Sequence, residues 1–484
     1  MPVTPELKDF IIDVGPDGTF RPSGTYQTIP EHIDGMFQKF AADNAKEIVI
    51  YFHGGLVNEK NGIASAIKMA TQFRAAGLTP VCFVWETGLI ETVINNINKI
   101  SDTKLFDKLV KLLIKKTSEK LGFDAVAGRG AGSMISDAEI EIELSKPEPF
   151  EKYDRVKNIA TRDAVTLAAI PADDVLQRTL RDEVRDMIDD DPSISIALSQ
   201  TELSLQSGPP GAAGGRGIIS TAMLVEHIVK IAFRVIKRFM EKRDHDFYPT
   251  IVEEILREIF VTELGAWVWN NMKVKSQDMW KDNTNASGLN RYAGRYFLQK
   301  LLDYTKDGSM KVSLIGHSAG SIAICNLLEA TTGIDPDFQY HHIAFMAPAC
   351  RIDLFEEQMV KQQQRYKEFR MYTMKDAVEK NDRLVPFIYT HSLLYLISGA
   401  LEDKGTAYDA YILGLERHIN GSYADPALSP VYDYLHAPST DRIVQSQTAA
   451  GTTLGYQSTA ISHGGFDDDL PTVSSIISFL KNKA

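Results

Sequence analysis

The sequence predicts an α/β fold with a mostly parallel central sheet and a large helical insertion, and three observations carry this prediction. Short apolar runs rich in β-branched and aromatic residues occur at residues 48–52, 81–85 and 312–315. Helical patterns separate these runs, and strand–helix alternation is typical of α/β folds with right-handed crossovers. The middle of the chain, from about residue 87 to residue 290, shows amphipathic helical patterns and little strand pattern.

The three apolar runs are expected to be buried parallel strands. Each run is continuously apolar rather than alternating, which is typical of strands that are covered on both faces. After the first run, apolar residues at helical spacing predict a helix over residues 62–76 that stops at Gly77. A helix is also expected over residues 321–330, and two further strands are expected at 343–347 and 369–374.

The chain is expected to divide into a core and an insertion. Residues 1–86 and 291–484 contain the strand–helix alternation and are expected to form one α/β domain. Residues 87–290 contain amphipathic helical patterns, for example at 105–116 and 218–241. This insertion is expected to form a helical cap, or lid.

Charge and hydropathy exclude some classes of function. The 484 residues include 64 acidic and 52 basic side chains, a formal net charge of −12. Because nucleic-acid binding depends on neutralising phosphates, no nucleic-acid partner is expected. No apolar run approaches the roughly 18 residues that a membrane span needs. The lysines of the helix expected at 105–116 leave peripheral contact with an anionic membrane open.

The cysteines and the first residues suggest a compartment. The three cysteines, Cys82, Cys325 and Cys350, are odd in number and far apart in sequence. This pattern favours neither a disulfide framework nor a cysteine-rich zinc site, and it suits a reducing environment. The first residues lack the apolar segment of a secretory signal. A cytoplasmic protein is therefore expected.

The strongest chemical motif is Gly316-His317-Ser318-Ala319-Gly320, between an expected strand and an expected helix. A sharp turn in this context strains the serine backbone and lifts its hydroxyl above the sheet edge. The N–H of Ala319 would then face an oxyanion next to the serine, with added positive potential from the helix N-terminus. The alternative interpretation is a glycine-rich turn in which Ser318 only caps the helix.

A second motif, His53-Gly54-Gly55, ends the first expected strand. Two residues without side chains allow N–H groups to approach a ligand oxygen, so Gly54 and Gly55 are candidates for a second oxyanion donor. His53 is expected to anchor this loop by hydrogen bonds rather than to act as a base. The alternative is a tight turn at the end of a strand.

A third motif, His463-Gly464-Gly465, lies near the C-terminal end, before a helix expected from about Pro471 with Asp469 as its cap. A general base requires an imidazole that can reach the serine hydroxyl. A single histidine is more often structural. His463 follows both glycine motifs in chain order, and this position favours its assignment as the general base.

Taken together, the three motifs resemble the α/β-hydrolase superfamily, on its lipase- and esterase-like side. The resemblance covers residues around 46–86, 311–376 and 455–480. It implies an α/β-hydrolase fold with Ser318 as nucleophile and His463 as base.

The resemblance also implies an oxyanion hole and an acid. The oxyanion hole would consist of Gly54, Gly55 and the N–H of Ala319. In this superfamily the acid follows a strand later than the nucleophile and precedes the base. Asp376, just after the strand expected at 369–374, is the expected acid; Asp382 is the runner-up and Asp353 a weaker third choice.

The function implied by the resemblance is hydrolysis of a carboxylic ester, a small-molecule or lipid-like substrate, through an acyl-enzyme. No cofactor and no metal ion are expected. Two alternatives stay open: a catalytically inactive hydrolase-fold binding protein, and an acyltransferase or peptidase that uses the same triad. The long insertion leaves the acyl and leaving groups undetermined, and the sequence does not indicate an oligomeric state.

Overall fold

The chain separates into two compact units in the computed structural model. The structure describes residues 6–54, 58–85, 89–123, 134–157, 173–200, 220–264, 266–402, 409–423 and 425–481. The first unit comprises Met1–Glu91, Val268–Asp382 and Tyr411–Ala484, and the second comprises Thr92–Trp267 and Arg383–Ala410. Residues 383–410 thus belong to the second unit. The helical insertion expected from the sequence covers only residues 87–290 and does not include them.

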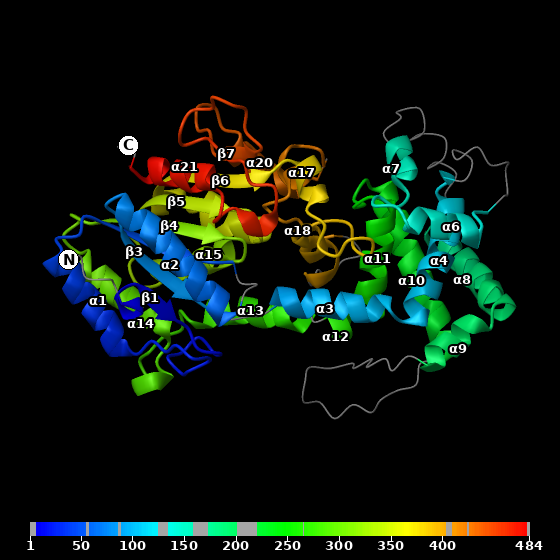
Figure 1. The fold of residues 1–484 in the computed structure, drawn as a ribbon, viewed down its shortest axis with the longest axis horizontal. Coiled ribbons are helices and arrows are strands. Elements are labelled where there is room, and N and C mark those ends of the chain that lie inside the picture. The colour runs from blue at the N-terminus through cyan, green and yellow to red at the C-terminus, as the bar shows by residue number, and fades with distance from the viewer. Residues whose placement is uncertain are drawn as a thin grey trace. The chain divides into compact units, whose positions relative to one another are not determined.

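An open, all-parallel sheet forms the centre of the first unit (Figure 1). Within the described residues it has seven strands in the order β1-β3-β2-β4-β5-β6-β7. The strands are β1 Ile11–Asp13, β2 Glu47–Phe52, β3 Thr79–Val84, β4 Lys311–His317, β5 Tyr340–Met346, β6 Tyr366–Met374 and β7 Ile443–Ser446. The predicted α/β class and the parallel sheet are therefore confirmed.

The register of the central strands fixes which loops are neighbours. Phe52, the last residue of β2, pairs with Phe83 of β3 on one side and with Gly316 of β4 on the other. Because the strands are parallel, their carboxyl ends meet at one edge of the sheet, where α/β proteins commonly bind ligands. The loop after β2 and the turn after β4 therefore lie next to each other.

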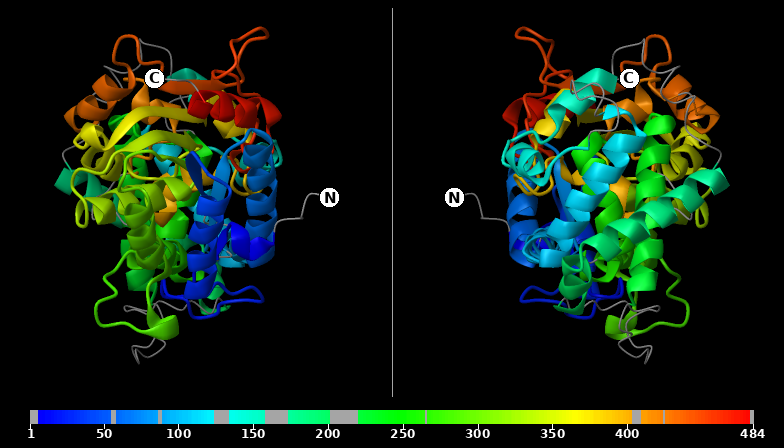
Figure 2. Two further views of the ribbon diagram at one scale, coloured as in Figure 1. Left: turned by 90° about the vertical axis from the view of Figure 1, so that its left-hand side faces the viewer. Right: turned by 90° about the vertical axis from the view of Figure 1, so that its right-hand side faces the viewer.

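Helices cover both faces of this sheet (Figure 2). On one face, α2 Glu59–Ala75 and α21 Leu470–Lys481 pack on a core that includes Val49, Tyr51 and Ile315. On the other face, Phe83 contacts Phe297 of α14, with 5.4 Å between ring centroids. The remaining helices of this unit are α1 Pro30–Ala42, α14 Ala293–Tyr304, α15 Gly320–Thr332, α16 Ile352–Phe355, α17 Asp376–Asn381, α19 Glu416–Ile419 and α20 Ser429–Leu435.

Helix boundaries follow the local signals in the sequence. The helix expected at 62–76 is α2, and Gly77 after it adopts a φ of +80°, which glycine accommodates without strain. The helix expected at 321–330 is α15. Asp469 caps α21 as predicted, because its carboxylate accepts the N–H of Thr472 at 3.1 Å.

The second unit is helical within the described residues. Two helices, α3 Leu89–Ser101 and α13 Ala266–Asp278, contain residues assigned to both units. The helices that lie wholly in the second unit are α4 Lys104–Lys120, α6 Asp137–Leu144, α7 Glu151–Lys157, α8 Asp173–Asp190, α9 Ser193–Gln200, α10 Thr221–Met240, α11 Phe247–Glu258, α12 Val261–Leu264 and α18 Leu393–Leu396. Across the described part of the chain, none of the helices has the length and apolar character to span a bilayer.

The basic side of α4 is matched by acidic partners. Its lysines form ion pairs of 2.7–3.2 Å, which are Lys108–Asp191, Lys111–Glu141, Lys115–Asp137 and Lys116–Glu183. This side of α4 therefore carries paired charges rather than a uniformly positive surface.

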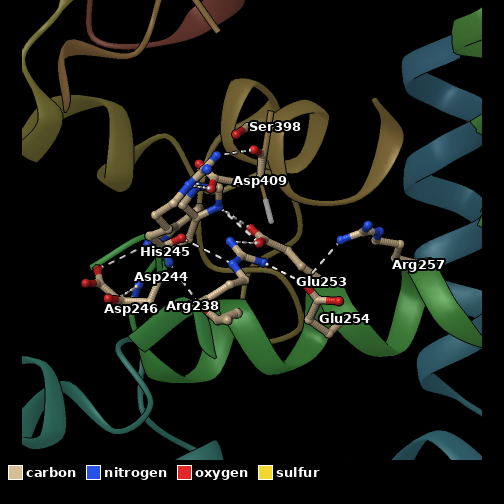
Figure 3. Close-up of polar contacts among 12 residues, drawn as sticks. Arg238, Asp244, His245, Asp246, Glu253, Glu254, Arg257, Ser398 and Asp409 are labelled. Carbon is tan, nitrogen blue, oxygen red and sulfur yellow. Dashed lines mark hydrogen bonds and ion pairs between the residues drawn. The ribbon is translucent and has the colours of Figure 1, made fainter. Parts of the chain in front are cut away.

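A fully buried ion network lies inside the second unit (Figure 3). Arg238 of α10 is 2.8 Å from Glu253 and 3.1 Å from Glu254, both on α11, and all three side chains have no exposed area. His245 Nδ1 lies 2.8 Å from Glu253, which also accepts a hydrogen bond from the Tyr389 hydroxyl at 2.7 Å. Residues 383–410 thus join the second unit through a carboxylate on α11.

Charge compensation explains how this network tolerates burial. Burial alone would raise the pKa of Glu253, but His245 and Arg238 outweigh it and lower that pKa to about 2. The same network includes Asp409, whose carboxylate accepts a hydrogen bond from Arg243 at 2.8 Å. A buried charge that loses its partner costs far more free energy than an exposed one.

We predict that Glu253→Gln lowers the free energy of unfolding by about 3 kcal/mol or more, because it leaves the buried Arg238 without one of its counter-charges. The matched control is Glu226→Gln on α10, whose ion pair with Arg181 has a carboxylate side chain 55% exposed. That control is expected to cost less than about 1 kcal/mol. Urea unfolding measures both, and equal losses would contradict the compensation argument.

Candidate active site

Ser318 occupies a strained turn between β4 and α15. Its φ is +52°, in the left-handed region that residues with a side chain rarely adopt. A Cβ on Gly316 would lie 2.7 Å from the Gly320 carbonyl carbon, and a Cβ on Gly320 would collide with the Phe52 carbonyl oxygen. Gly316 is therefore required for the turn to close onto α15, and Gly320 is required for the turn to pack against β2.

Hydrogen bonds fix this turn. The N–H of Ser318 donates to the Met346 carbonyl at 2.8 Å, and the Ser318 carbonyl accepts from the Ala349 N–H at 3.1 Å. The Ser321 hydroxyl also donates to the Ser318 carbonyl, at 2.6 Å. With its backbone groups bonded in this way, Ser318 has only its side chain free to face a reacting group.

His463 lies next to this serine. Its Nε2 is 2.8 Å from the Ser318 Oγ, and the two residues are 5% and 1% exposed respectively. His463 begins the short 3₁₀ helix η8, His463–Gly465. Burial, and secondarily the nearby His317, lower the pKa of His463 to about 3, so the resting imidazole is neutral. The structure thus brings together the predicted nucleophile and base.

One ring nitrogen of His463 has no hydrogen-bond partner in the described part of the chain. Within the described residues, its buried Nδ1 makes no hydrogen bond. When Nε2 accepts a proton from a hydroxyl, Nδ1 carries the other ring proton. Nδ1 is therefore the position at which a carboxylate would be expected in a catalytic triad.

Of the three aspartates proposed from sequence, Asp382 contacts the base. Its Oδ2 accepts the main-chain N–H of His463 at 2.6 Å. Burial raises the pKa of Asp382, and the hydrogen bond from His463 partly offsets this rise. The carboxylate is thus beside the base, at its backbone rather than at its ring.

The other two aspartates pair elsewhere. Asp376, the expected acid, is the first residue of α17, and its carboxylate lies 3.3 Å from Lys380 one turn later. Asp353 forms an ion pair with Arg351 at 2.5 Å. Since Nδ1 of His463 has no partner among the described residues, the structure does not bring Asp376 to the base.

Two predicted oxyanion donors lie at the serine. Ala319 precedes α15, and its N–H has no hydrogen-bond acceptor within the described residues. Gly54 lies against the nucleophile, because a Cβ placed on it would be 3.4 Å from the Ser318 Cβ. The third predicted donor, Gly55, lies outside the described residues.

His53 is hydrogen-bonded to its own loop, as the sequence predicts. Its Nδ1 is 2.7 Å from the Gly54 carbonyl and its Nε2 accepts the N–H of Trp85 at 3.2 Å. The Trp85 indole returns a bond to the His53 carbonyl at 3.1 Å. Burial lowers the pKa of His53 to about 4, which favours the neutral ring that can make both bonds.

Two residues of the site, His317 and Asp467, are not predicted from the sequence. His317 Nε2 donates to the His463 carbonyl at 2.9 Å, and its Nδ1 lies 3.9 Å from Asp467. Asp467 accepts a hydrogen bond from Ser65 at 2.6 Å. His317 belongs to the serine motif and Asp467 follows the His463-Gly464-Gly465 motif, but nothing in either segment indicates which side chain faces the other segment.

Comparisons with known proteins do not assign a relative. No family model, curated protein or solved structure matches this chain. The fold and the site define an α/β protein with a buried serine–histidine pair at the carboxyl edge of a parallel sheet.

The anchoring of His53 predicts a pH dependence of stability. Its pKa is about 4 in the folded chain and near the ordinary histidine value of 6.5 in the unfolded chain, so the unfolded state binds the proton first as pH falls. Stability is then lost as pH drops from about 6.5 towards about 4, by about 3 kcal/mol for this group.

We predict that His53→Asn, which keeps a donor near Nδ1 but cannot titrate, flattens the fall in thermal midpoint between pH 7 and pH 4.5. The control is His436→Asn, at an exposed histidine. If both variants followed the wild-type pH dependence, the neutral anchor would be disproved.

Proposed function

We propose that this protein is a serine hydrolase with an α/β-hydrolase fold that cleaves a carboxylic ester through an acyl-enzyme. One observation carries the proposal: the hydroxyl of Ser318, at a left-handed turn, lies 2.8 Å from Nε2 of a buried, neutral His463. A hydroxyl becomes a nucleophile when an adjacent base can take its proton.

The proposed reaction follows from this pair. His463 accepts the proton as the Ser318 oxygen attacks the ester carbonyl, and the tetrahedral oxyanion faces the N–H groups of Ala319 and the Gly54 loop. Collapse of the intermediate expels the alcohol, protonated by His463. Water activated by the same imidazole then releases the acid and restores the serine.

The fold supports the same proposal. The turn with Ser318 follows a central strand, β4, and the glycine loop follows its neighbour β2. The long stretch between β3 and β4 contains the helices of the second unit other than α18, and we propose that they serve as a cap. Their apolar faces, including buried Ile228 and Val235 of α10, are compatible with a helical cap domain.

We further propose that Asp382 is the acid. A base with a pKa of about 3 binds a proton weakly, and a carboxylate at Nδ1 would stabilise the imidazolium that forms during attack. Asp382 already touches the main chain of His463. A rotation of the carboxylate that brings its second oxygen to the ring Nδ1, while Oδ2 keeps the N–H, would complete the triad.

A specific observation favours a second candidate, an inactive hydrolase-fold binding protein. Nδ1 of His463 is buried and makes no hydrogen bond within the described residues. If Asp382 stays at the main chain, the imidazolium has no counter-charge and proton transfer from Ser318 is disfavoured. No observation singles out an acyltransferase or a peptidase.

We predict that a fluorophosphonate probe labels the wild type and not Ser318→Ala, because the probe bonds only to an activated serine oxygen. The control is Ser313→Ala on the same strand, whose hydroxyl faces Glu47 at 3.3 Å and which should label normally. Equal labelling of Ser318→Ala and wild type would overturn the assignment, and no labelling of the wild type would support the inactive protein.

We predict that Asp382→Asn lowers kcat for a nitrophenyl ester by at least about 100-fold. The amide oxygen can still accept the His463 N–H, so the loop is retained while the negative charge is lost. Asp376→Asn, which removes the charge that pairs with Lys380, is expected to keep most of the activity. The reverse ranking of these two variants would identify Asp376 as the acid.

A further inference from the structure

We infer that His317 is a positioning residue for the base, a role that rests on the proposed function. The inference starts from the main chain of His463, which is held at both of its polar atoms. Asp382 accepts its N–H at 2.6 Å, and His317 Nε2 donates to its carbonyl at 2.9 Å. With both groups fixed, only the two side-chain torsions of His463 remain to place Nε2.

The position of His317 in the chain gives this contact its importance. His317 is the last residue of β4 and directly precedes the nucleophile, whereas His463 is 146 residues away in sequence. The same segment therefore contains Ser318 and donates a hydrogen bond to the main chain of the base. A displacement of the turn would move the hydroxyl and the imidazole together, which preserves the 2.8 Å contact between them.

A carboxylate, Asp467, lies near the other ring nitrogen of His317. The His317 side chain is 7% exposed, and its Nδ1 faces Asp467 Oδ1 at 3.9 Å. The other oxygen of Asp467 accepts hydrogen bonds from Ser65 at 2.6 Å and from Tyr51 at 3.4 Å. Because β2 supplies Tyr51 and α2 supplies Ser65, the Asp467 carboxylate near His317 is held by the sheet and by a covering helix.

The role of His317 is distinct from that of the catalytic pair. It contacts the carbonyl of the base and neither its ring nitrogens nor the Ser318 hydroxyl. Its loss should therefore change the placement of the base and leave substrate binding intact. Misplacement of a catalytic group by about 1 Å can cost up to 100-fold in rate.

The test compares two amides that differ by one methylene group. In His317→Gln the side-chain nitrogen can occupy the position of Nε2 and donate to the His463 carbonyl. In His317→Asn the nitrogen corresponds to Nδ1 and falls short of that carbonyl. Both variants are polar and uncharged, so burial and charge are matched and only the reach differs.

We expect Asn to lower kcat by about 10-fold or more with KM within about twofold, and Gln to stay within about threefold of the wild type. Hydrogen exchange of the peptide that contains residues 459–468 should be faster in Asn and unchanged in Gln. Equal kcat values for Asn and wild type, or equal losses in Asn and Gln, would overturn the inference.

The exchange measurement separates this inference from the proposed function. If the wild type shows no esterase activity and no fluorophosphonate labelling, the proposed function fails and with it the positioning role. Faster exchange in Asn alone would then still confirm the His317–His463 contact. If the wild type is active and exchange is the same in all three proteins, the proposed function stands and the role of His317 is wrong.

Discussion

The hydrogen bond between the Ser318 hydroxyl and His463 is the interaction on which the site depends. It joins the turn after β4 to a loop near the end of the chain, and it exists because Ser318 is held at a φ of +52°. Backbone strain of this kind persists only when its surroundings enforce it. Here the close approach of Gly316 and Gly320 and the hydrogen bonds to the Ser318 backbone provide that constraint.

Burial determines the chemistry available to this pair. It holds the pKa of His463 near 3, so the imidazole is ready to accept a proton but binds it weakly. A negative charge close to Nδ1 would raise the pKa of His463 and stabilise its protonated form. Asp382, whose own pKa is raised by burial, is the carboxylate beside the base. In the second unit the pKa of a buried carboxylate falls instead, since Glu253 lies beside His245 and Arg238, which lower its pKa to about 2.

Local patterns predict the parts of this structure that local forces decide. The central strands, α2, α15, the serine turn and the cap of α21 all follow from runs of a few residues. The edge strands β1 and β7, with three and four residues, are too short to produce such a pattern. Asp376 shows where prediction from local sequence stops at the site. Its position just after a strand suits a catalytic acid, but it begins α17 and its carboxylate pairs with Lys380. The contact of Tyr389 with Glu253 likewise joins residues 136 apart in sequence, which no local pattern reveals.

A crystal structure of the protein after reaction with a fluorophosphonate would test the central claim most directly. The account predicts phosphorus bonded to the Ser318 Oγ, the phosphoryl oxygen directed at the Ala319 N–H, and the Asp382 carboxylate within hydrogen-bond distance of His463 Nδ1. An unmodified Ser318, or an adduct with no carboxylate near Nδ1, would contradict it.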